Sequence, residues 1–138
     1  MVITTMSIND YEELKQLWIN TPGMGMNEMD DSKEGIAKYL SRNPRTCFVA
    51  RDEEQLIGGI LSGHDGRRGY IYHTAVAESA REKGVGTALL ERALHALKEE
   101  GITKVALLAY IDNEIGNSFW KGKGFLSRKD VLYRNKDI

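Results

Sequence analysis

The chain has 138 residues, of which 41% are hydrophobic and 28% are charged, and its formal net charge is −1. This length fits one globular domain over residues 1–138 with a sizeable core, and the near-zero charge gives no overall field that would recruit nucleic acid. No apolar run approaches the roughly 20 residues that cross a bilayer, and the first ten residues lack the pattern of a signal peptide. We therefore expect a cytoplasmic protein with no membrane partner.

The single cysteine, Cys47, lies in the apolar stretch TCFVA and has no second cysteine with which to form a disulfide. A buried structural thiol is the expected role, rather than a nucleophile, and an unpaired cysteine fits a reducing compartment. The three histidines lack the spacing of metal ligands, so we expect no bound metal.

The first part of the chain predicts one strand and two helices. VITT (2–5) is a short β-type run, and the segment that begins with NDYEELKQLW is helical, with Asn9 and Glu12 at capping-box spacing. After the irregular loop NTPGMGMNEMD, a second helix over about 32–42 starts after Asp31 and ends before Pro44.

The middle of the chain has the period of strands. TCFVAR, LIGGILSG and GYIYHTAV predict an antiparallel meander, joined by the links DEEQ and HDGRR. A helix of about 15 residues then ends at Gly101. TKVALLAY is nearly all apolar, which predicts a central strand, parallel to the strand before the helix.

The last part predicts a short helix within GNSFWKGKGF and a closing hairpin within FLSRKDVLYRN. The hairpin has a free edge that can pair with another chain, so a homodimer is one expected state. The predicted order is β-α-α-β-β-β-α-β-α-β-β. It describes a mixed α/β fold whose central mixed sheet has about six or seven strands and is flanked by about four helices.

The stretch REKGVGTALL (81–90) lies between a predicted strand and the long helix. Gly84 and Gly86 have no side chain to obstruct a phosphate, the first helical turn leaves N–H groups unpaired, and Arg81 and Lys83 add positive charge. An ordinary glycine turn explains this stretch alone equally well. A nucleoside-triphosphate loop would end in GK[ST], and a dinucleotide loop would have a third glycine, and neither is present.

Two motifs surround the long helix and the strand after it. The first is R/Q-x-x-G-x-G/A, present as REKGVG (81–86), and the second is N-x-x-A-x-x-F-Y-x-x-x-G-F, which NEIGNSFWKGKGF (113–125) follows with two departures. With the order of elements, they make the chain resemble the GNAT superfamily of acyl-CoA-dependent N-acyltransferases. The resemblance covers nearly the whole chain as topology, and is sharp at residue level over about 74–125.

The resemblance implies that acetyl-CoA is the co-substrate and lies between two splayed central strands. Its pyrophosphate would lie on backbone N–H groups of about 82–87, and its pantetheine arm against 74–76. The implied cofactor-binding residues are Thr74, Ala75, Val76, Arg81, Glu82, Lys83, Gly84, Val85, Gly86, Thr87, Asn113, Phe119 and Trp120. Asn113 is also plausible as a helix N-cap, and Phe119 as a core residue.

The implied reaction is direct attack of a primary amine, on a small molecule or a peptide, on the thioester. It needs a base for the amine and a donor for the oxyanion, for which the backbone N–H near Val76 is expected. His73 is the expected base because it directly precedes 74–76 and histidine titrates near neutral pH. A hydrogen-bonded structural histidine is the alternative, and the weaker candidate bases are Asp65, Glu28, Asp30 and Asp31.

One departure from the second motif affects the chemistry. The family often has a tyrosine, usually assigned as the acid for the leaving thiolate, where this chain has Trp120, and an indole N–H is not a usable proton source at pH 7. Tyr110 or Tyr133 could replace it, or the thiolate leaves without an acid. A non-catalytic acyl-CoA-binding sensor or accessory module is therefore the second hypothesis, and a nucleotide-binding protein is the third.

The acceptor is expected beside the loop TPGMGMNEMDD, whose methionines could form an adaptable wall and whose carboxylates could attract a cationic amine. Arg67 and Arg68 could reach an acceptor carboxylate. These features do not choose between an amino-acid-like acceptor and a peptide terminus.

Overall fold

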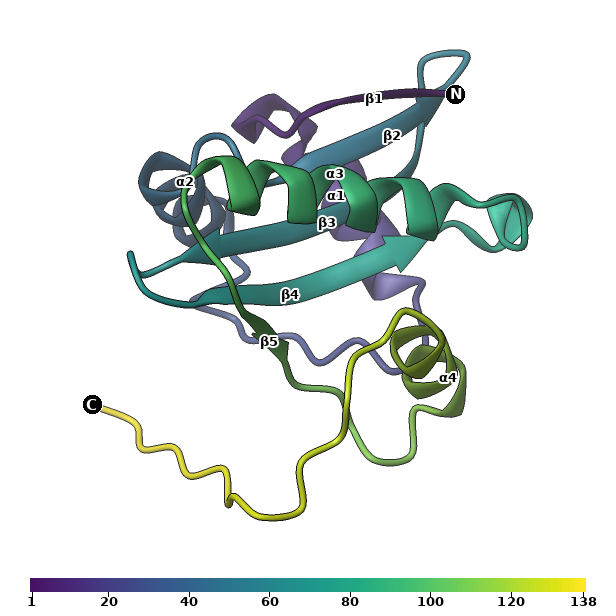
Figure 1. Ribbon diagram of the computed structural model, residues 1–138. Helices are drawn as coiled ribbons and strands as arrows, with labels where there is room; N and C mark the ends of the chain where they lie inside the picture. Colours follow the sequence, from purple (N-terminus) through teal and green to yellow (C-terminus); the bar gives the residue numbers. More distant parts are fainter. The chain divides into compact units, whose positions relative to one another are not determined.

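The computed structural model describes residues 1–138. The elements follow the predicted order as far as the last helix (Figure 1). They are β1 (Val2–Thr5), α1 (Tyr11–Ile19), α2 (Lys33–Arg42), β2 (Phe48–Asp52), β3 (Gln55–His64), β4 (Gly69–Val76), α3 (Val85–Glu99), β5 (Val105–Leu107) and α4 (Glu114–Gly122), with short 3-10 helices η1 (Ile8–Asp10) and η2 (Glu78–Ala80). Two compact units are distinguishable, Met1–Leu108 and Ala109–Ile138.

The first unit contains one five-stranded sheet in the order β1-β2-β3-β4-β5. The pairings β1–β2, β2–β3 and β3–β4 are antiparallel, as the meander predicts. The pairing β4–β5 is parallel, as expected for strands joined through a helix. The mixed α/β fold class is thus confirmed, with five strands and not six or seven.

Two strand predictions are wrong. β5 has only three residues and forms the edge of the sheet instead of its centre, although TKVALLAY is nearly all apolar. Residues 125–135 contain no strand, and the side chains of Leu126, Leu132 and Tyr133 are exposed. A two-stranded hairpin is stable only when its apolar face packs against other elements, and a local pattern does not say whether such a partner exists. The homodimer expectation therefore loses the hairpin edge on which it was based.

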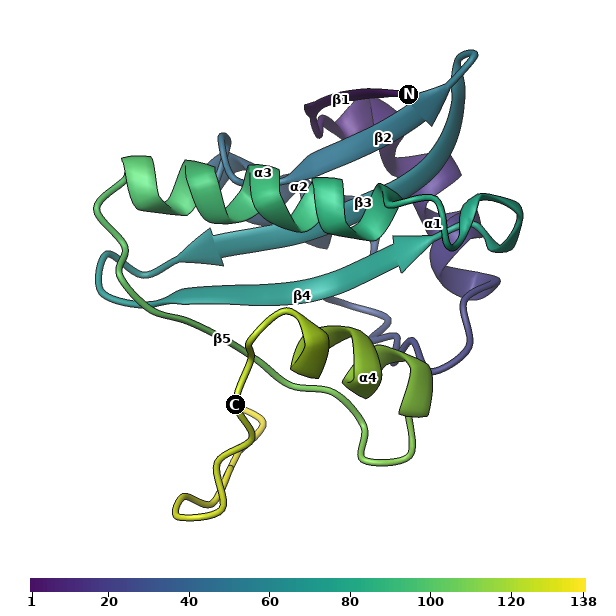
Figure 2. The same cartoon turned by 45° about the vertical axis from the view of Figure 1, so that its right-hand side comes forward.

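The helices of the first unit cover both faces of the sheet, with α1 and α2 on one side and α3 on the other (Figures 1 and 2). Consecutive glycines of β3 show the two sides. A Cβ on Gly58 would meet Leu89 and Val85 of α3, whereas a Cβ on Gly59 would meet Leu14 of α1. The main core cluster lies on the α1–α2 side and includes Trp18, Leu40, Val49, Leu61 and Ala75.

The N-terminal capping box is formed by other residues than the predicted Asn9 and Glu12. The Ser7 hydroxyl accepts from the N–H of Asn9 at 3.2 Å, and the Asp10 carboxylate accepts from the N–H of Ser7 at 2.8 Å. The helix therefore begins with η1, and α1 continues from it. The second helix starts as predicted, because the Ser32 hydroxyl caps α2 by accepting from the N–H of Gly35.

No helix of this fold combines the length and the apolar composition that crossing a membrane requires.

Candidate active site

β4 carries an extra residue in its middle. Thr74 pairs with Ile60 and Ile71 pairs with Ser62, so Tyr72 and His73 together oppose the single residue Leu61. Such a bulge changes the alternation of side chains along the strand. As a result, the rings of both Tyr72 and His73 contact the helices on the α1–α2 side, through Tyr39 of α2 and Trp18 of α1, respectively. The bulge thus turns His73 toward α1.

β4 also has an edge without a strand partner. Its parallel pairing with β5 covers only Gly69, Tyr70 and Ile71, whereas β4 itself continues to Val76. Along 74–76 the side of β4 that faces away from β3 is therefore not paired with any strand of the sheet. The predicted residues Thr74, Ala75 and Val76 lie in this segment. An unpaired strand edge can pair with the amide groups of an extended ligand.

The loop after β4 leads into an uncapped helix. Gly84 is the N-cap of α3 and has the left-handed φ of 81°, and no side chain caps the N–H groups of Val85, Gly86 and Thr87. The first turn of α3 also contains no acidic residue. In contrast, α2 and α4 are both capped by side chains, those of Ser32 and Asn113. α3 thus begins with free N–H donors at the positive end of its dipole.

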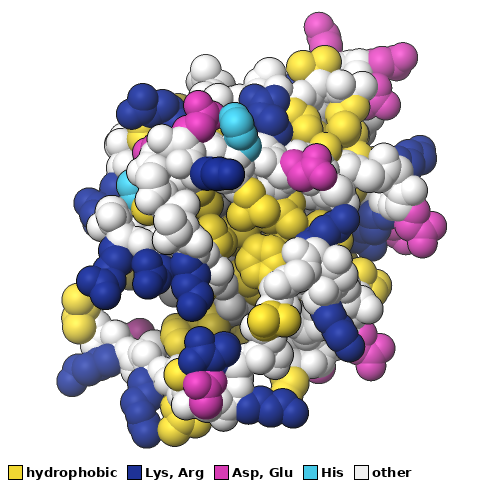
Figure 3. Space-filling model, viewed as in Figure 1, with side chains coloured by type: hydrophobic (Ala, Val, Ile, Leu, Met, Phe, Trp, Pro, Cys, Tyr) yellow, Lys and Arg dark blue, Asp and Glu magenta, His cyan; other side chains and the backbone are white.

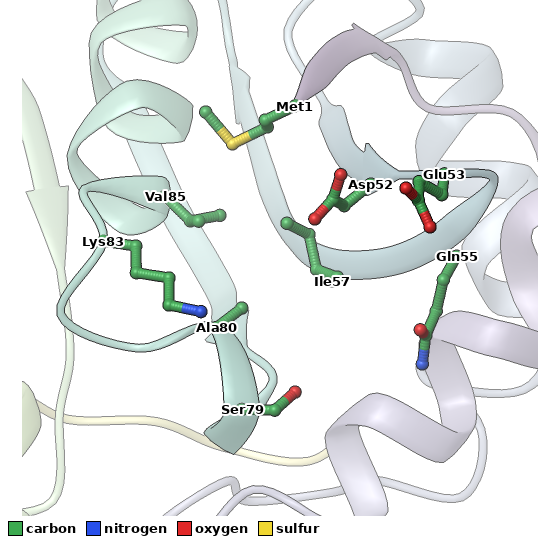
Figure 4. Close-up of a pocket in the computed structure, with 9 residues that line it drawn as sticks. All are labelled: Met1, Asp52, Glu53, Gln55, Ile57, Ser79, Ala80, Lys83 and Val85. Atoms are coloured by element: carbon green, nitrogen blue, oxygen red, sulfur yellow. The ribbon is translucent and has the colours of Figure 1, made fainter.

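The charged side chains of this loop, Arg81 and Lys83, have different surroundings. The Arg81 Nε donates to the carbonyl of Val76 at 3.2 Å, which ties the loop to the end of β4. Glu82 has a positive φ of 63°. Lys83 lines a pocket of about 410 Å³, and Figure 4 shows Asp52 and Glu53 on the opposite side of that pocket.

Acidic side chains gather over the β2–β3 turn, as the space-filling view shows (Figure 3). This turn contributes Asp52 and Glu53 to the pocket, so the pocket suits a cation better than a phosphate. The free N–H donors of this loop thus belong to its backbone, whereas the Lys83 side chain faces carboxylates.

His73 is part of a side-chain network. Its Nε2 lies 2.8 Å from Oδ1 of Asp31, the residue that precedes the N-cap of α2, and the His73 and Asp31 side chains are only 15% and 11% exposed. The Trp18 ring packs edge-on against the His73 ring at a centroid distance of 4.9 Å. The Asp31 contact, 42 residues away in the sequence, has no local signal that could predict it.

Asp31 is ionised in this network. Burial by itself would raise the pKa of Asp31, but the hydrogen bond to His73, the N–H of Asn27 and the charge of His73 outweigh burial and hold this pKa below its ordinary 3.8. A carboxylate with such a low pKa is a poor general base at neutral pH.

The other candidate bases and acceptor residues lie on the surface. Asp65 is in the β3–β4 turn, at the opposite end of β4 from Val76, and its Oδ1 accepts from the N–H groups of Arg67 and Arg68 at 2.8 Å. These backbone N–H groups, that of Arg68 first, lower the pKa of Asp65. Glu28 and Asp30 are exposed in the α1–α2 loop.

Cys47 has the structural role expected for it. It is fully buried, its Sγ donates to the carbonyl of Ser62 at 3.1 Å, and burial raises the pKa of its thiol to about 12. The thiol therefore stays protonated and is not a nucleophile.

In the second unit, Asn113 is the N-cap of α4, and its Oδ1 accepts from the N–H of Gly116 at 3.1 Å. Trp120 packs edge-on between Phe119 and Phe125, with centroid distances of 5.0 and 5.3 Å. Tyr110 and Tyr133, the alternative acids, are 61% and 65% exposed. The N-cap interpretation of Asn113 is thus confirmed, and Trp120 is part of an aromatic cluster.

The chain is similar to several known acetyltransferases. It is 27% identical over 138 residues to an acetyltransferase of Sodalis glossinidius, covering 100% of this chain and 96% of that protein. It is 32% identical over 114 residues to N-alpha-acetyltransferase 30 of Schizosaccharomyces pombe, covering 75% of each chain. Its fold matches the crystal structure of the PaiA N-acetyltransferase from Thermoplasma acidophilum in complex with coenzyme A, with a TM-score of 0.77, 21% identity and coverage of 89% of this chain and 87% of that one.

The sequence also matches the acetyltransferase (GNAT) family over residues 11–125, which includes β4, the glycine loop and both motifs. On these grounds the chain belongs to the GNAT acetyltransferase family.

Proposed function

We propose that residues 1–138 form a single N-acetyltransferase domain, which transfers an acetyl group from acetyl-CoA to a primary amine. The observation that carries this proposal is the uncapped start of α3, together with the unpaired edge at the end of β4, the strand that precedes α3. The location in the cytoplasm stays a prediction.

The start of α3 fits the diphosphate of CoA. The N–H groups of Val85, Gly86 and Thr87 have no partner within the helix, and no acidic side chain of the first turn would repel an anion. The left-handed Gly84 directs the chain into this first turn. Arg81 adds positive charge from the side of β4, where its Nε bond to Val76 holds it.

The unpaired edge of β4 fits the pantetheine arm. This arm is extended and carries amide groups, so it can form strand-like hydrogen bonds along Thr74, Ala75 and Val76. The thioester would then lie close to the bulge at His73. The proposed donor to the developing oxyanion is then a backbone N–H beside the bulge, rather than the one expected near Val76, which lies three residues or about 10 Å further along the strand.

His73 is the proposed base for the amine. It directly precedes the proposed pantetheine segment, and its partner Asp31 is ionised. No tyrosine occupies the position of Trp120, so we propose that the thiolate leaves without a tyrosine acid. A CoA thiol is acidic enough, with a pKa of about 8.5 for a comparable thiol, to leave as the anion.

The direct test is release of free thiol from acetyl-CoA when amines are added, with a panel of peptides with free N-termini, small primary amines and aminoglycosides. Peptides come first because a relative of 32% identity is named an N-alpha-acetyltransferase. We expect thiol release that depends on one acceptor class. Tight CoA binding without thiol release in the entire panel would support the accessory-module alternative, for which the absence of a tyrosine at Trp120 is the motivating observation.

Calorimetry with CoA, ATP and NAD tests the cofactor separately. We expect binding of CoA alone, and preferential binding of ATP or NAD would refute the proposal.

A further inference from the structure

Asp31 uses every one of its polar groups. Its Oδ1 bonds to His73 Nε2 at 2.8 Å, and its Oδ2 accepts from the N–H of Asn27 at 2.7 Å. Its carbonyl accepts from the Tyr11 hydroxyl at 2.6 Å, and its own N–H donates to the carbonyl of Asn27 at 2.9 Å. The position of this carboxylate is therefore fixed from α1, from the α1–α2 loop and from β4.

The His73 ring is held on two sides. Asp31 binds its Nε2, and the fully buried Trp18 packs against the ring. The bulge of β4 provides the third constraint, because it directs His73 to this side of the sheet. The ring thus has a fixed orientation before any substrate binds.

The state of Asp31 determines which nitrogen of His73 carries the proton. An ionised carboxylate has only acceptor atoms, so the nitrogen that faces it must be an N–H donor. Asp31 is ionised at neutral pH, as its lowered pKa requires. Neutral His73 then has its proton on Nε2, and Nδ1 keeps the free lone pair.

We infer that Asp31 is a positioning residue, which holds His73 as the Nε2–H tautomer and so makes Nδ1 the atom that accepts the proton of the acceptor amine. This inference rests on the proposed transferase function. It gives Asp31 a role distinct from that of a base, and it connects the α1–α2 loop to the chemistry on β4.

The ammonium form of the acceptor loses two protons in the overall reaction. His73 Nδ1 takes one proton from the ammonium form of the acceptor, which leaves a neutral amine and an imidazolium that the Asp31 carboxylate stabilises. The amine nitrogen forms a bond to the carbonyl carbon of the thioester, the C–S bond breaks, and the thiolate leaves with the electron pair. One of the two protons on the attacking nitrogen passes to the thiolate or to water, the other stays on the amide, and the imidazolium returns its proton to water.

The first experiment needs no variant of Asp31 and no activity. In protein labelled with ¹⁵N-histidine, two-bond ¹H–¹⁵N correlations distinguish the two neutral tautomers, and a His73→Gln variant assigns the signals of His73 among the three histidines. We expect the Nε2–H tautomer for the neutral His73 ring of the wild type. The Nδ1–H tautomer would overturn the inference.

The second experiment compares Asp31→Asn with Glu34→Gln, a matched control that removes one carboxylate from an exposed position three residues further on, in the first turn of α2. A general base contributes about 10²–10⁴-fold to a rate, so loss of its orientation should lower kcat by at least about tenfold. We expect this loss for Asp31→Asn, with the KM for acetyl-CoA within about twofold of the wild type. Glu34→Gln should keep the wild-type kcat.

A double variant separates positioning from a merely structural role. If Asp31 acts through His73, adding Asp31→Asn to His73→Gln should lower kcat little further, because residues that act as a unit are not additive. Fully additive losses, or an equal loss in Glu34→Gln, would overturn the inference. The tautomer measurement also distinguishes a failure of the Asp31–His73 contact from a failure of the transferase proposal. If the Nε2–H tautomer is found but no acceptor is acetylated, the transferase proposal fails while the Asp31–His73 geometry stands.

Discussion

Replacement of Gly84 by alanine tests whether the start of α3 is a binding site or only a turn. Gly84 has a φ of 81°, a conformation that an L-residue with a Cβ rarely adopts. The new Cβ would meet no atom within 4 Å, so the cost of the substitution is backbone strain without a clash. This strain acts on the residue that directs the chain into the free N–H groups of α3.

The left-handed conformation costs a non-glycine residue about 1–2 kcal/mol. With an unfolding entropy of about 2.1 cal/mol/K per residue, a chain of 138 residues loses about 3–7 °C in Tm for this cost. If the loop relieves the strain by changing its backbone conformation, one hydrogen bond from a backbone N–H to a phosphate is lost as well. A hydrogen bond to a charged group contributes about 1.5–3 kcal/mol, which corresponds to a loss in CoA affinity of at least about tenfold.

Gly101 provides a matched control at the other end of the same helix. It has a φ of 85°, and a Cβ there also meets nothing within 4 Å. Gly101→Ala should therefore lower Tm as much as Gly84→Ala in a thermal melt, while calorimetry should show a weaker Kd for CoA only in Gly84→Ala. Equal CoA affinity in the two variants would refute the anion-site argument, and an unchanged Tm in both would refute the strain argument.

Three further outcomes follow from the contacts. Gly58→Ala should lower the free energy of unfolding, measured in urea, by about 1–3 kcal/mol. Its Cβ would lie 3.0 Å from Leu89 Cδ1 and 3.2 Å from the carbonyl oxygen of Ala75. An unchanged midpoint of the urea unfolding curve would show that α3 moves freely to make room. The free energy of unfolding should be larger in the wild type than in Asp31→Asn by an amount that is full above pH 3.8. This difference should disappear as the pH falls through the lowered pKa of Asp31 in the folded state, because protonation then favours unfolding. A difference that is independent of pH speaks against an ionised pair. Asn113→Ala should cost about 1 kcal/mol and speed hydrogen exchange in α4, whereas Asn113→Asp should retain the cap; similar exchange in both variants contradicts the capping role.

Sequence alone predicts the parts of this fold that depend on local pattern. Strand alternation and turn residues give the meander from β2 to β4, with β4 predicted at its exact bounds, and the length of α3 is also correct. The glycine loop and the second motif are enough for the family. Each of these features is determined by residues that are close in the chain.

The features that the sequence did not predict depend on distant contacts. The bulge at Tyr72 and His73 arises from pairing with β3, and the partner of His73 comes from the start of α2. Asp31 was a candidate base and not a partner, because nothing near it in the chain points to β4. The short β5 and the missing hairpin likewise depend on which elements find a packing partner, and apolar composition does not reveal this.

The extra residue in β4 also has a consequence for comparing this chain with its relatives. It divides the strand into two halves of opposite phase, so that Tyr72 faces α2 while His73 and Ala75, only one and three positions later, face α1. A substitution of Tyr72 can therefore change the side chain that faces α2 without altering the side chains of His73 and Ala75 that face α1. An alignment with a relative that lacks the extra residue must therefore place the gap at Tyr72 or His73, because a gap placed elsewhere would assign the residues between it and the bulge to the wrong face of the sheet.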